Sequence, residues 1–313
     1  NLADAAMLSR MMVPEMERKG YNRAFAAAIT AGGSLVTPII PPGIALIIYG
    51  LVADVSIGKM FIAGLVPGLL CAVVLMFTVY LVARKTNAKP SRESWPTGKE
   101  VVFSLGQAWP ALFLIFAVVG GIRANIFTPT EAGAVAVLIV LAIGFFIYRE
   151  MRISHVVKAL GETARATASV MLVIMASAAL GWIFSMEHAG VAVANFVTSL
   201  TENKYMFLLI INILLLTLGM FLEGNAILLI LVPLLKPVVE HFGIDPVHFG
   251  IIMIFNLSIG AFTPPVGTVM LLVCNTVQVS VGQFMREAVP LLISLILLLL
   301  VITYIPAISL LLV

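Results

Sequence analysis

Long apolar runs without a charged side chain recur through this sequence and constrain its fold more than any other feature. Two of them cover residues 60–82 and 291–304. A helix of about 20 apolar residues is long enough to cross the hydrocarbon core of a bilayer. Hydrophobic residues make up 61% and charged residues 11% of the 313 positions, whereas soluble domains contain roughly 45–50% apolar residues. The chain is therefore predicted to be an all-α, polytopic (multi-pass) membrane protein, which excludes secreted disulfide scaffolds and nucleic-acid binders.

The sequence repeats itself when it is shifted by 223 positions. Two related halves explain this match better than a chance resemblance between proline-bearing apolar helices. In the second half the aligned block follows the apolar run 205–222, whose first-half counterpart would lie before residue 1. We therefore expect the given sequence to lack an N-terminal part. The aligned pairs are Pro14 with Pro237, Pro41 with Pro264, Pro42 with Pro265, and Pro67 with Pro290.

Lysine and arginine cluster in three segments, residues 10–23, 84–99 and 149–165. Because basic connections stay on the cytoplasmic side, these clusters predict that the two halves are inverted relative to each other. They also leave residues 205–235 starting and finishing outside. This favours a re-entrant hairpin with its tip at residues 223–226 over two full spans joined by a tight turn. Crossings are expected near residues 22–54, 60–83, 103–122, 128–149, 167–186, 248–279 and 287–306.

Two of the expected crossings are interrupted by prolines near the middle of the membrane, at residues 34–43 and 260–268. Proline removes amide donors and excludes regular helix, which leaves carbonyl groups without partners. In hydrocarbon such groups survive only where protein, water or an ion satisfies them. The freed carbonyls and the hydroxyls of Thr37 and Thr263 suit sodium, and the half-helix N-termini suit an anionic solute. The alternative is a pair of proline kinks made for packing.

The other polar residues have less specific explanations. Asp4 is a candidate binding residue, or it faces water at a helix end. For Glu131 we favour a carboxylate that stabilises a helix N-terminus over a transport role. His241 and His248 are expected in solvated connections. Residues 150–166 are read as an amphipathic surface helix or a charged connection. The sequence contains no HExxH or GxSxG motif, so it is not predicted to be an enzyme.

Seven motifs, in this order along the chain, resemble those of the large membrane subunit of tripartite ATP-independent periplasmic (TRAP) transporters. The resemblance runs from end to end. At one point it departs: family members often have serine after the first proline pair, where this chain has Gly43. The motifs are Ala3-Asp4-Ala5-Ala6, Pro14-Glu15-Met16, Gly20-Tyr21, Pro41-Pro42-Gly43, Phe127-Thr128-Pro129-Thr130-Glu131-Ala132, Gly243-Ile244-Asp245-Pro246 and Thr263-Pro264-Pro265-Val266-Gly267.

The resemblance implies an inverted-repeat, elevator-type ion transporter fold with re-entrant hairpins and two broken helices. It implies sodium-driven secondary active import of a carboxylate solute, of the C4-dicarboxylate or sialic acid type, across the bacterial inner membrane. The implied partners are a small membrane subunit and a periplasmic substrate-binding protein. Residues 1–54 and 205–280 would form the transport domain, and residues 55–204 and 281–313 the scaffold.

The resemblance also implies the ligands. It assigns the first sodium (Na+) site to Asn1, Thr37, Pro38 and Pro41, the second to Gly224, Asn225, Gly260, Thr263 and Pro264, and the solute to Asp4, Thr37, Asn225 and Thr268. Two alternatives stay open. A carbonyl-lined anion or cation channel would use similar helix breaks, and a membrane-embedded enzyme would need a nucleophile or metal cluster.

Overall fold

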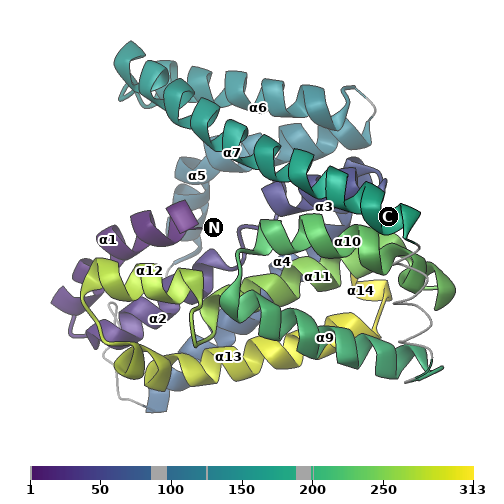
Figure 1. Cartoon of the computed structure of the whole chain (residues 1–313). Coiled ribbons are helices and arrows are strands. Elements are labelled where there is room, and N and C mark those ends of the chain that lie inside the picture. Colours follow the sequence, from purple (N-terminus) through teal and green to yellow (C-terminus); the bar gives the residue numbers. More distant parts are fainter. Residues whose placement is uncertain (1, 86–96, 125, 188–198, 200) are drawn as a thin grey trace. The chain divides into compact units, whose positions relative to one another are not determined.

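The computed structural model describes residues 2–85, 97–124, 126–187, 199 and 201–313 (Figure 1). Helices are the only regular elements in these ranges, as the all-α prediction requires. The chain divides into two compact units, one formed by Asn1–Ser91 with Ile183–Val313 and the other by Arg92–Trp182. The second unit contains α5 (Gly98–Arg123), α6 (Pro129–Ala142), a short π-helix (η1, Ile143–Ile147) and most of α7 (Ile153–Met186).

The first unit contains the two halves of the sequence repeat. Its helices from the first half are α1 (Leu2–Arg18), α2 (Arg23–Ser34), α3 (Ile44–Ala53) and α4 (Ile57–Lys85). Its helices from the second half are α9 (Lys204–Phe221), α10 (Gly224–His241), α11 (Pro246–Phe262), α12 (Thr268–Val277), α13 (Val281–Tyr304) and the short α14 (Ala307–Leu310).

Both predicted helix breaks are present. The first has the predicted limits, because α2 ends at Ser34 and α3 begins at Ile44. The second is shorter than the predicted 260–268, because Gly260 to Phe262 stay helical and the Thr263 amide closes the helix on the Gly260 carbonyl at 3.0 Å. Each break contains a cis peptide bond within its proline pair.

Helix boundaries recur between the halves. The helices α1 and α10 end 223 residues apart, and each is followed by a glycine with positive φ, Gly20 at 87° and Gly243 at 60°. Glycine is favoured there because a left-handed residue often terminates a helix. After the breaks the spacing becomes 224 residues, since α3 and α12 begin at Ile44 and Thr268. The Pro67–Pro290 match therefore lies one residue out of register with the helices that carry it.

Packing in the first unit exchanges elements between the halves. Helix α1 packs on α12, and α10, its counterpart, packs on α3. Likewise α2 packs on α13 while α11 packs on α4, and α4 and α13 pack on each other. Each half thus buries its apolar faces against the other half, and this pairing brings the two breaks and the turn between α9 and α10 into one unit.

A buried polar cluster corrects one prediction. His248 was expected in a solvated connection, but it lies in the first turn of α11 and is 2% exposed. Its ring nitrogens lie 3.2 Å from Ser309 Oγ and 3.3 Å from the Thr303 carbonyl, because α13 and α14 cover this end of α11. His241 is exposed, as expected.

Two asparagines extend this cluster deeper into the unit. Asn256 Nδ2 donates to Asn212 Oδ1 at 2.7 Å, and Asn212 Nδ2 donates to Thr303 Oγ1 at 3.0 Å. Asn256 is fully buried, and its Oδ1 has no hydrogen-bond partner within the described part of the chain. Leaving a buried acceptor unsatisfied costs about 1–3 kcal/mol. The cluster therefore does not maximise stability.

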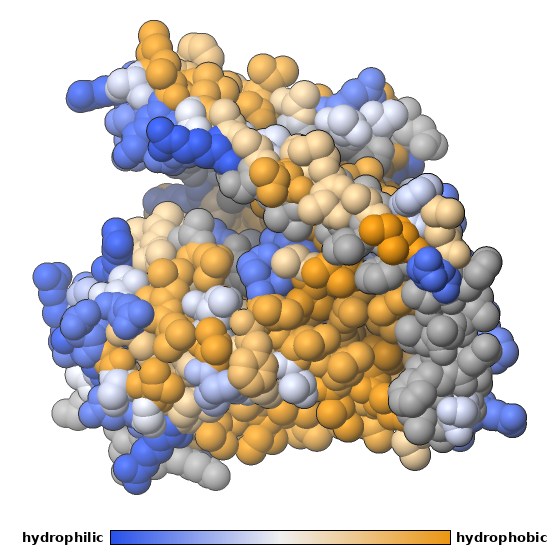
Figure 2. Space-filling view, viewed as in Figure 1, coloured by the Kyte–Doolittle hydropathy of each residue, from blue (hydrophilic) through white to orange (hydrophobic). Residues whose placement is uncertain are grey.

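Among the described residues, five helices are long and apolar enough to cross a membrane, or six if the bent pair within α5 counts as one span. The predicted surface helix 150–166 is instead continuous with the next expected crossing in the single helix α7. Glu131 caps its own helix, accepting hydrogen bonds from the Thr128 amide and hydroxyl at 2.7 and 2.9 Å. Figure 2 shows a broad apolar surface, to which α13 contributes exposed residues at four-residue spacing, Val289, Ile293, Leu297 and Val301.

Candidate functional site

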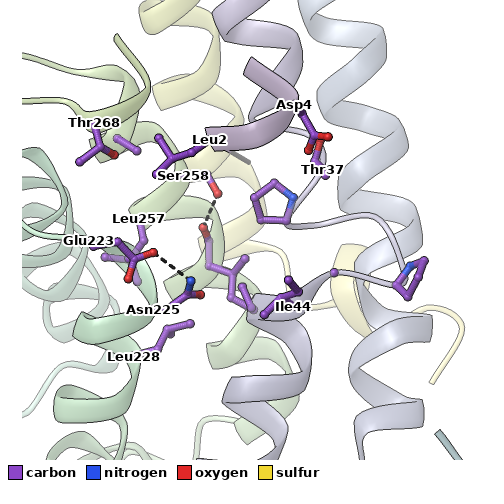
Figure 3. Close-up of a pocket in the computed structure, with 17 residues that line it drawn as sticks. Leu2, Asp4, Thr37, Ile44, Glu223, Asn225, Leu228, Leu257, Ser258 and Thr268 are labelled. Atoms are coloured by element: carbon purple, nitrogen blue, oxygen red, sulfur yellow. Dashed lines mark hydrogen bonds between the residues drawn. The ribbon is translucent and has the colours of Figure 1, made fainter. Parts of the chain in front are cut away.

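A cavity of about 360 Å³ lies in the first unit where the turn between α9 and α10, both helix breaks, α1 and α11 converge (Figure 3). Its walls come from the N-terminal end of α1, the first break with the start of α3, the turn with the start of α10, one face of α11, and the start of α12. Every part of the repeat that the sequence marks as irregular therefore contributes to one space.

The turn between α9 and α10 is held by its own side chains. Glu223 is the N-cap of α10, and its Oε2 accepts a hydrogen bond from the Ala226 amide at 3.0 Å. Its Oε1 accepts from Asn225 Nδ2 at 2.9 Å, the bond drawn in Figure 3. The Gly267 amide in the second break donates to the Met220 carbonyl at 2.9 Å. The turn is thus tied directly to the second break.

Two helices begin at the cavity without a side-chain cap. The N-caps of α3 and α12 are Gly43 and Gly267, and neither makes a side-chain capping bond. The amides of a first helical turn have no intrahelical partner and attract anions. Gly43 also has no room for a side chain, since an added Cβ would overlap the Pro38 carbonyl oxygen. This overlap accounts for glycine at the position where the family often has serine.

The ionisable side chains among the described residues that line the cavity are both acidic, Asp4 and Glu223. Figure 3 shows Asp4 beside Thr37 on one side and Glu223 beside Asn225 on the other. Because the described lining includes no lysine, arginine or histidine, the walls favour cations. An anion would have to be held by amide and hydroxyl groups or by a bound cation.

The structure brings some of the predicted ligands together and leaves others apart. All four residues predicted to bind the solute, Asp4, Thr37, Asn225 and Thr268, line this cavity. From the two predicted sodium sites, Pro38 and Gly224 line it as well. The remaining predicted sodium ligands within the described residues, Pro41, Gly260, Thr263 and Pro264, do not contribute to its lining, and Asn1 lies outside the described residues.

Two of the residues outside the lining are engaged locally. Gly260 packs against the backbone of α9, where its added Cβ would lie 2.6 Å from the carbonyl carbon of Gly219. Thr263 is 7% exposed, and its hydroxyl donates to the Ile259 carbonyl at 2.7 Å. That bond uses the hydroxyl proton and leaves the oxygen free to accept. The second predicted sodium set therefore straddles the cavity wall.

Sequence reasoning missed Ser258 as a lining residue. Its Oγ donates to the Ile254 carbonyl at 2.8 Å, and it is 5% exposed. Ile254, Leu257, Ser258 and Ala261 all line the cavity, at the three- and four-residue spacing of one helix face. That periodicity in the run before the second break would have identified the face. Glu223 was recognised as part of the tip, but not as a candidate ligand.

Comparison with known proteins agrees with this geometry. Residues 1–308 match the family model described as "Tripartite ATP-independent periplasmic transporter, DctM component". The chain is 38% identical, over 98% of its length and 72% of the relative's, to the C4-dicarboxylate TRAP transporter large permease protein of Pseudomonas aeruginosa. It is also 38% identical to the sialic acid TRAP transporter large permease protein of Vibrio cholerae, over 99% of its length and 72% of the relative's.

A third relative carries a different solute in its name. The 2,3-diketo-L-gulonate TRAP transporter large permease protein of Escherichia coli is 34% identical over 97% of the chain and 71% of the relative. These proteins are transporter permeases rather than enzymes. The chain therefore belongs to the DctM family of TRAP transporters, as an inner-membrane large permease that works with a small membrane subunit and a periplasmic binding protein.

Proposed function

We propose that this permease performs sodium-driven secondary active import of a carboxylate solute, which the periplasmic binding protein delivers. The observation that carries the proposal is the single cavity at which both proline breaks, the α9–α10 turn and two uncapped helix N-termini converge. It combines groups suited to a cation with groups suited to an anion. A packing kink would need neither a cavity nor free helix ends.

Sodium would be held by oxygen atoms of the two breaks and of the turn. The first site would use Thr37, Pro38 and Pro41, together with Asn1. The second would use Gly224 and Asn225 from the turn with Gly260, Thr263 and Pro264 from α11 and its break. The committed hydroxyl proton of Thr263 supports this assignment, because the oxygen keeps its lone pairs for a cation.

The solute would lie between these sites, near Asp4, Thr37, Asn225 and Thr268. The relatives are named for C4-dicarboxylate, sialic acid and 2,3-diketo-L-gulonate, and each of these solutes carries a carboxylate. A carboxylate fits the uncapped N-termini of α3 and α12. Since the two ionisable lining residues are acidic, bound sodium would also offset their repulsion of an anion.

Membrane potential and the sodium gradient would supply the energy. One positive charge that moves inward across 100 mV releases about 2.3 kcal/mol. Two sodium ions that enter with a monoanion carry one net charge, so they gain this energy in addition to their concentration gradients. Accumulation of the solute then needs no ATP.

Alternating access would follow from an inverted repeat and an elevator movement. The exchanged packing of α1 on α12 and α10 on α3 supports two related halves, and the basic clusters support their inversion. The hairpin α9–α10 would be re-entrant, and residues 1–54 and 205–280 would move against a scaffold of residues 55–204 and 281–313. Helices α4 and α13 share a compact unit with the hairpin and the broken helices, so the scaffold boundary stays a prediction.

The test is solute uptake into proteoliposomes that contain the permease, its small subunit and an external binding protein loaded with solute. An inward sodium gradient should drive concentrative uptake that saturates with the loaded binding protein. Uptake that is equally fast without sodium would refute the proposal. Flux that never exceeds equilibrium would favour the channel alternative instead.

A further inference from the structure

The hairpin arm α9 and the broken helix α11 pack along most of their lengths and meet at three fixed points. At the first, Asn256 Nδ2 donates to Asn212 Oδ1 at 2.7 Å. At the second, the two backbones touch at the glycine pair, since an added Cβ at Gly260 would lie 2.7 Å from the Gly219 Cα. At the third, the Gly267 amide donates to the Met220 carbonyl at 2.9 Å. The last two points lie close to the turn, and the asparagine pair lies deeper in the unit.

The asparagine pair is surrounded by apolar residues and is anchored at both ends. Asn256 uses its other amide hydrogen on the Ile252 carbonyl at 2.9 Å, within its own helix. Asn212 donates to Thr303 Oγ1 on α13 at 3.0 Å. Asn212 is 2% exposed and Asn256 0%. If α9 slid along α11, these amides would face the apolar side chains of the next turn and lose their partners.

The pair carries an energetic penalty that stability alone does not explain. Asn256 Oδ1 remains without a partner within the described ranges, whereas two apolar side chains of similar shape would leave nothing unsatisfied. A buried asparagine that fixes the register of two packed helices at the expense of stability is the best-attested use of such a group.

We propose that Asn212 and Asn256 are positioning residues that fix the register of α9 on α11. They thereby hold the Glu223–Asn225 turn opposite Thr268, where the cavity is formed. A slip of one helical turn would move the turn by about 5.4 Å, beyond the reach of any ion or hydrogen bond. The effect on sodium rests on the proposed function, whereas the effect on helix register does not.

The experiment replaces both asparagines at once, as Asn212→Leu with Asn256→Leu, in the permease assembled with its small subunit. Leucine is close to asparagine in shape and leaves no polar group unpaired. The matched control is Thr78→Val, which removes a buried hydroxyl that bonds only to Val74 within its own helix, 2.8 Å away. Three quantities are measured: the melting temperature, the half-saturating sodium concentration for uptake, and a distance between spin labels.

The labels report register without reference to transport. They are attached at Leu222→Cys, beside the turn, and at Asn275→Cys on α12; both positions are exposed and neither lines the cavity. The buried native cysteines are removed as Cys71→Ala and Cys274→Ala. Pulsed electron spin resonance then gives the distribution of distances between the labels.

We expect the double variant to melt within about 3 °C of the parent. Its label distances should broaden or shift by about 5 Å, and its half-saturating sodium concentration should rise about fivefold or more. The Thr78→Val control should leave the label distances and the sodium dependence unchanged. Parental distances in a folded double variant would overturn the proposal, and so would an equal sodium effect in the control.

If the double variant does not fold, Asn256→Ser is used, because its hydroxyl is too short to reach Asn212. The same broadening supports the proposal, and an unchanged distribution overturns it. If the parent takes up solute without sodium, the proposed function fails, and the label distances still decide whether the asparagines fix the register.

Discussion

Replacing Gly260 with alanine adds a methyl group at the closest approach of α9 and α11. The added Cβ would lie 2.6 Å from the carbonyl carbon of Gly219, 2.7 Å from its Cα and 3.1 Å from its oxygen. These are backbone atoms within a helix, so no side chain can rotate out of the way, and the two helices must separate. Overpacking of this kind costs about 1–3 kcal/mol.

At about 2–4 °C per kcal/mol for a unit of this size, the melting temperature of Gly260→Ala should fall by roughly 3–10 °C. The assay is thermal unfolding of the purified protein in detergent or nanodiscs. The matched control is Gly282→Ala, a helical glycine in α13 whose added Cβ meets nothing within 4 Å. It should be neutral or raise the melting temperature, because alanine is the better helix former. Equal melting temperatures for the two variants would refute the close contact between α9 and α11.

Three further predictions concern the site. Thr263→Ala should raise the half-saturating sodium concentration about tenfold while Thr263→Ser restores it; an unchanged sodium titration of uptake would count against a Thr263 ligand. Glu223→Gln keeps a side chain able to cap α10 but removes a charge from the cavity wall, so it should weaken sodium activation about threefold to tenfold with little change in melting temperature; a selective loss of stability would show that Glu223 only caps the helix. Gly43→Ala should displace the start of α3 from Pro38 and lower the uptake rate at least about tenfold; parental uptake would show that the N-terminus of α3 is not part of the binding site.

Local proline chemistry made the helix breaks predictable from sequence. The first break has the predicted limits because three prolines within five positions exclude helix whatever surrounds them. The second was predicted to begin too early, at Gly260, because glycine alone does not end a helix. Contact with Gly219 on α9 keeps Gly260 helical, and no local pattern contains that contact.

Residues whose environment depends on distant helices were harder to predict. His248 was assigned to water because Gly243 and Pro246 precede it, yet α13 and α14 bury it against Thr303 and Ser309. Ser258 was overlooked because the search for ligands followed the breaks rather than the face of the helix leading to them. The four predicted solute residues do line one cavity, since the motifs around them mark the irregular segments that form it.

A cryo-electron microscopy map of the permease with its small subunit, in nanodiscs with sodium and a bound solute, tests the central claim most directly. The account predicts density for the solute between Thr37, Asn225 and Thr268, with the two proline breaks on either side of it at mid-membrane depth. Solute density at another location, or proline breaks that face the lipid, would contradict it.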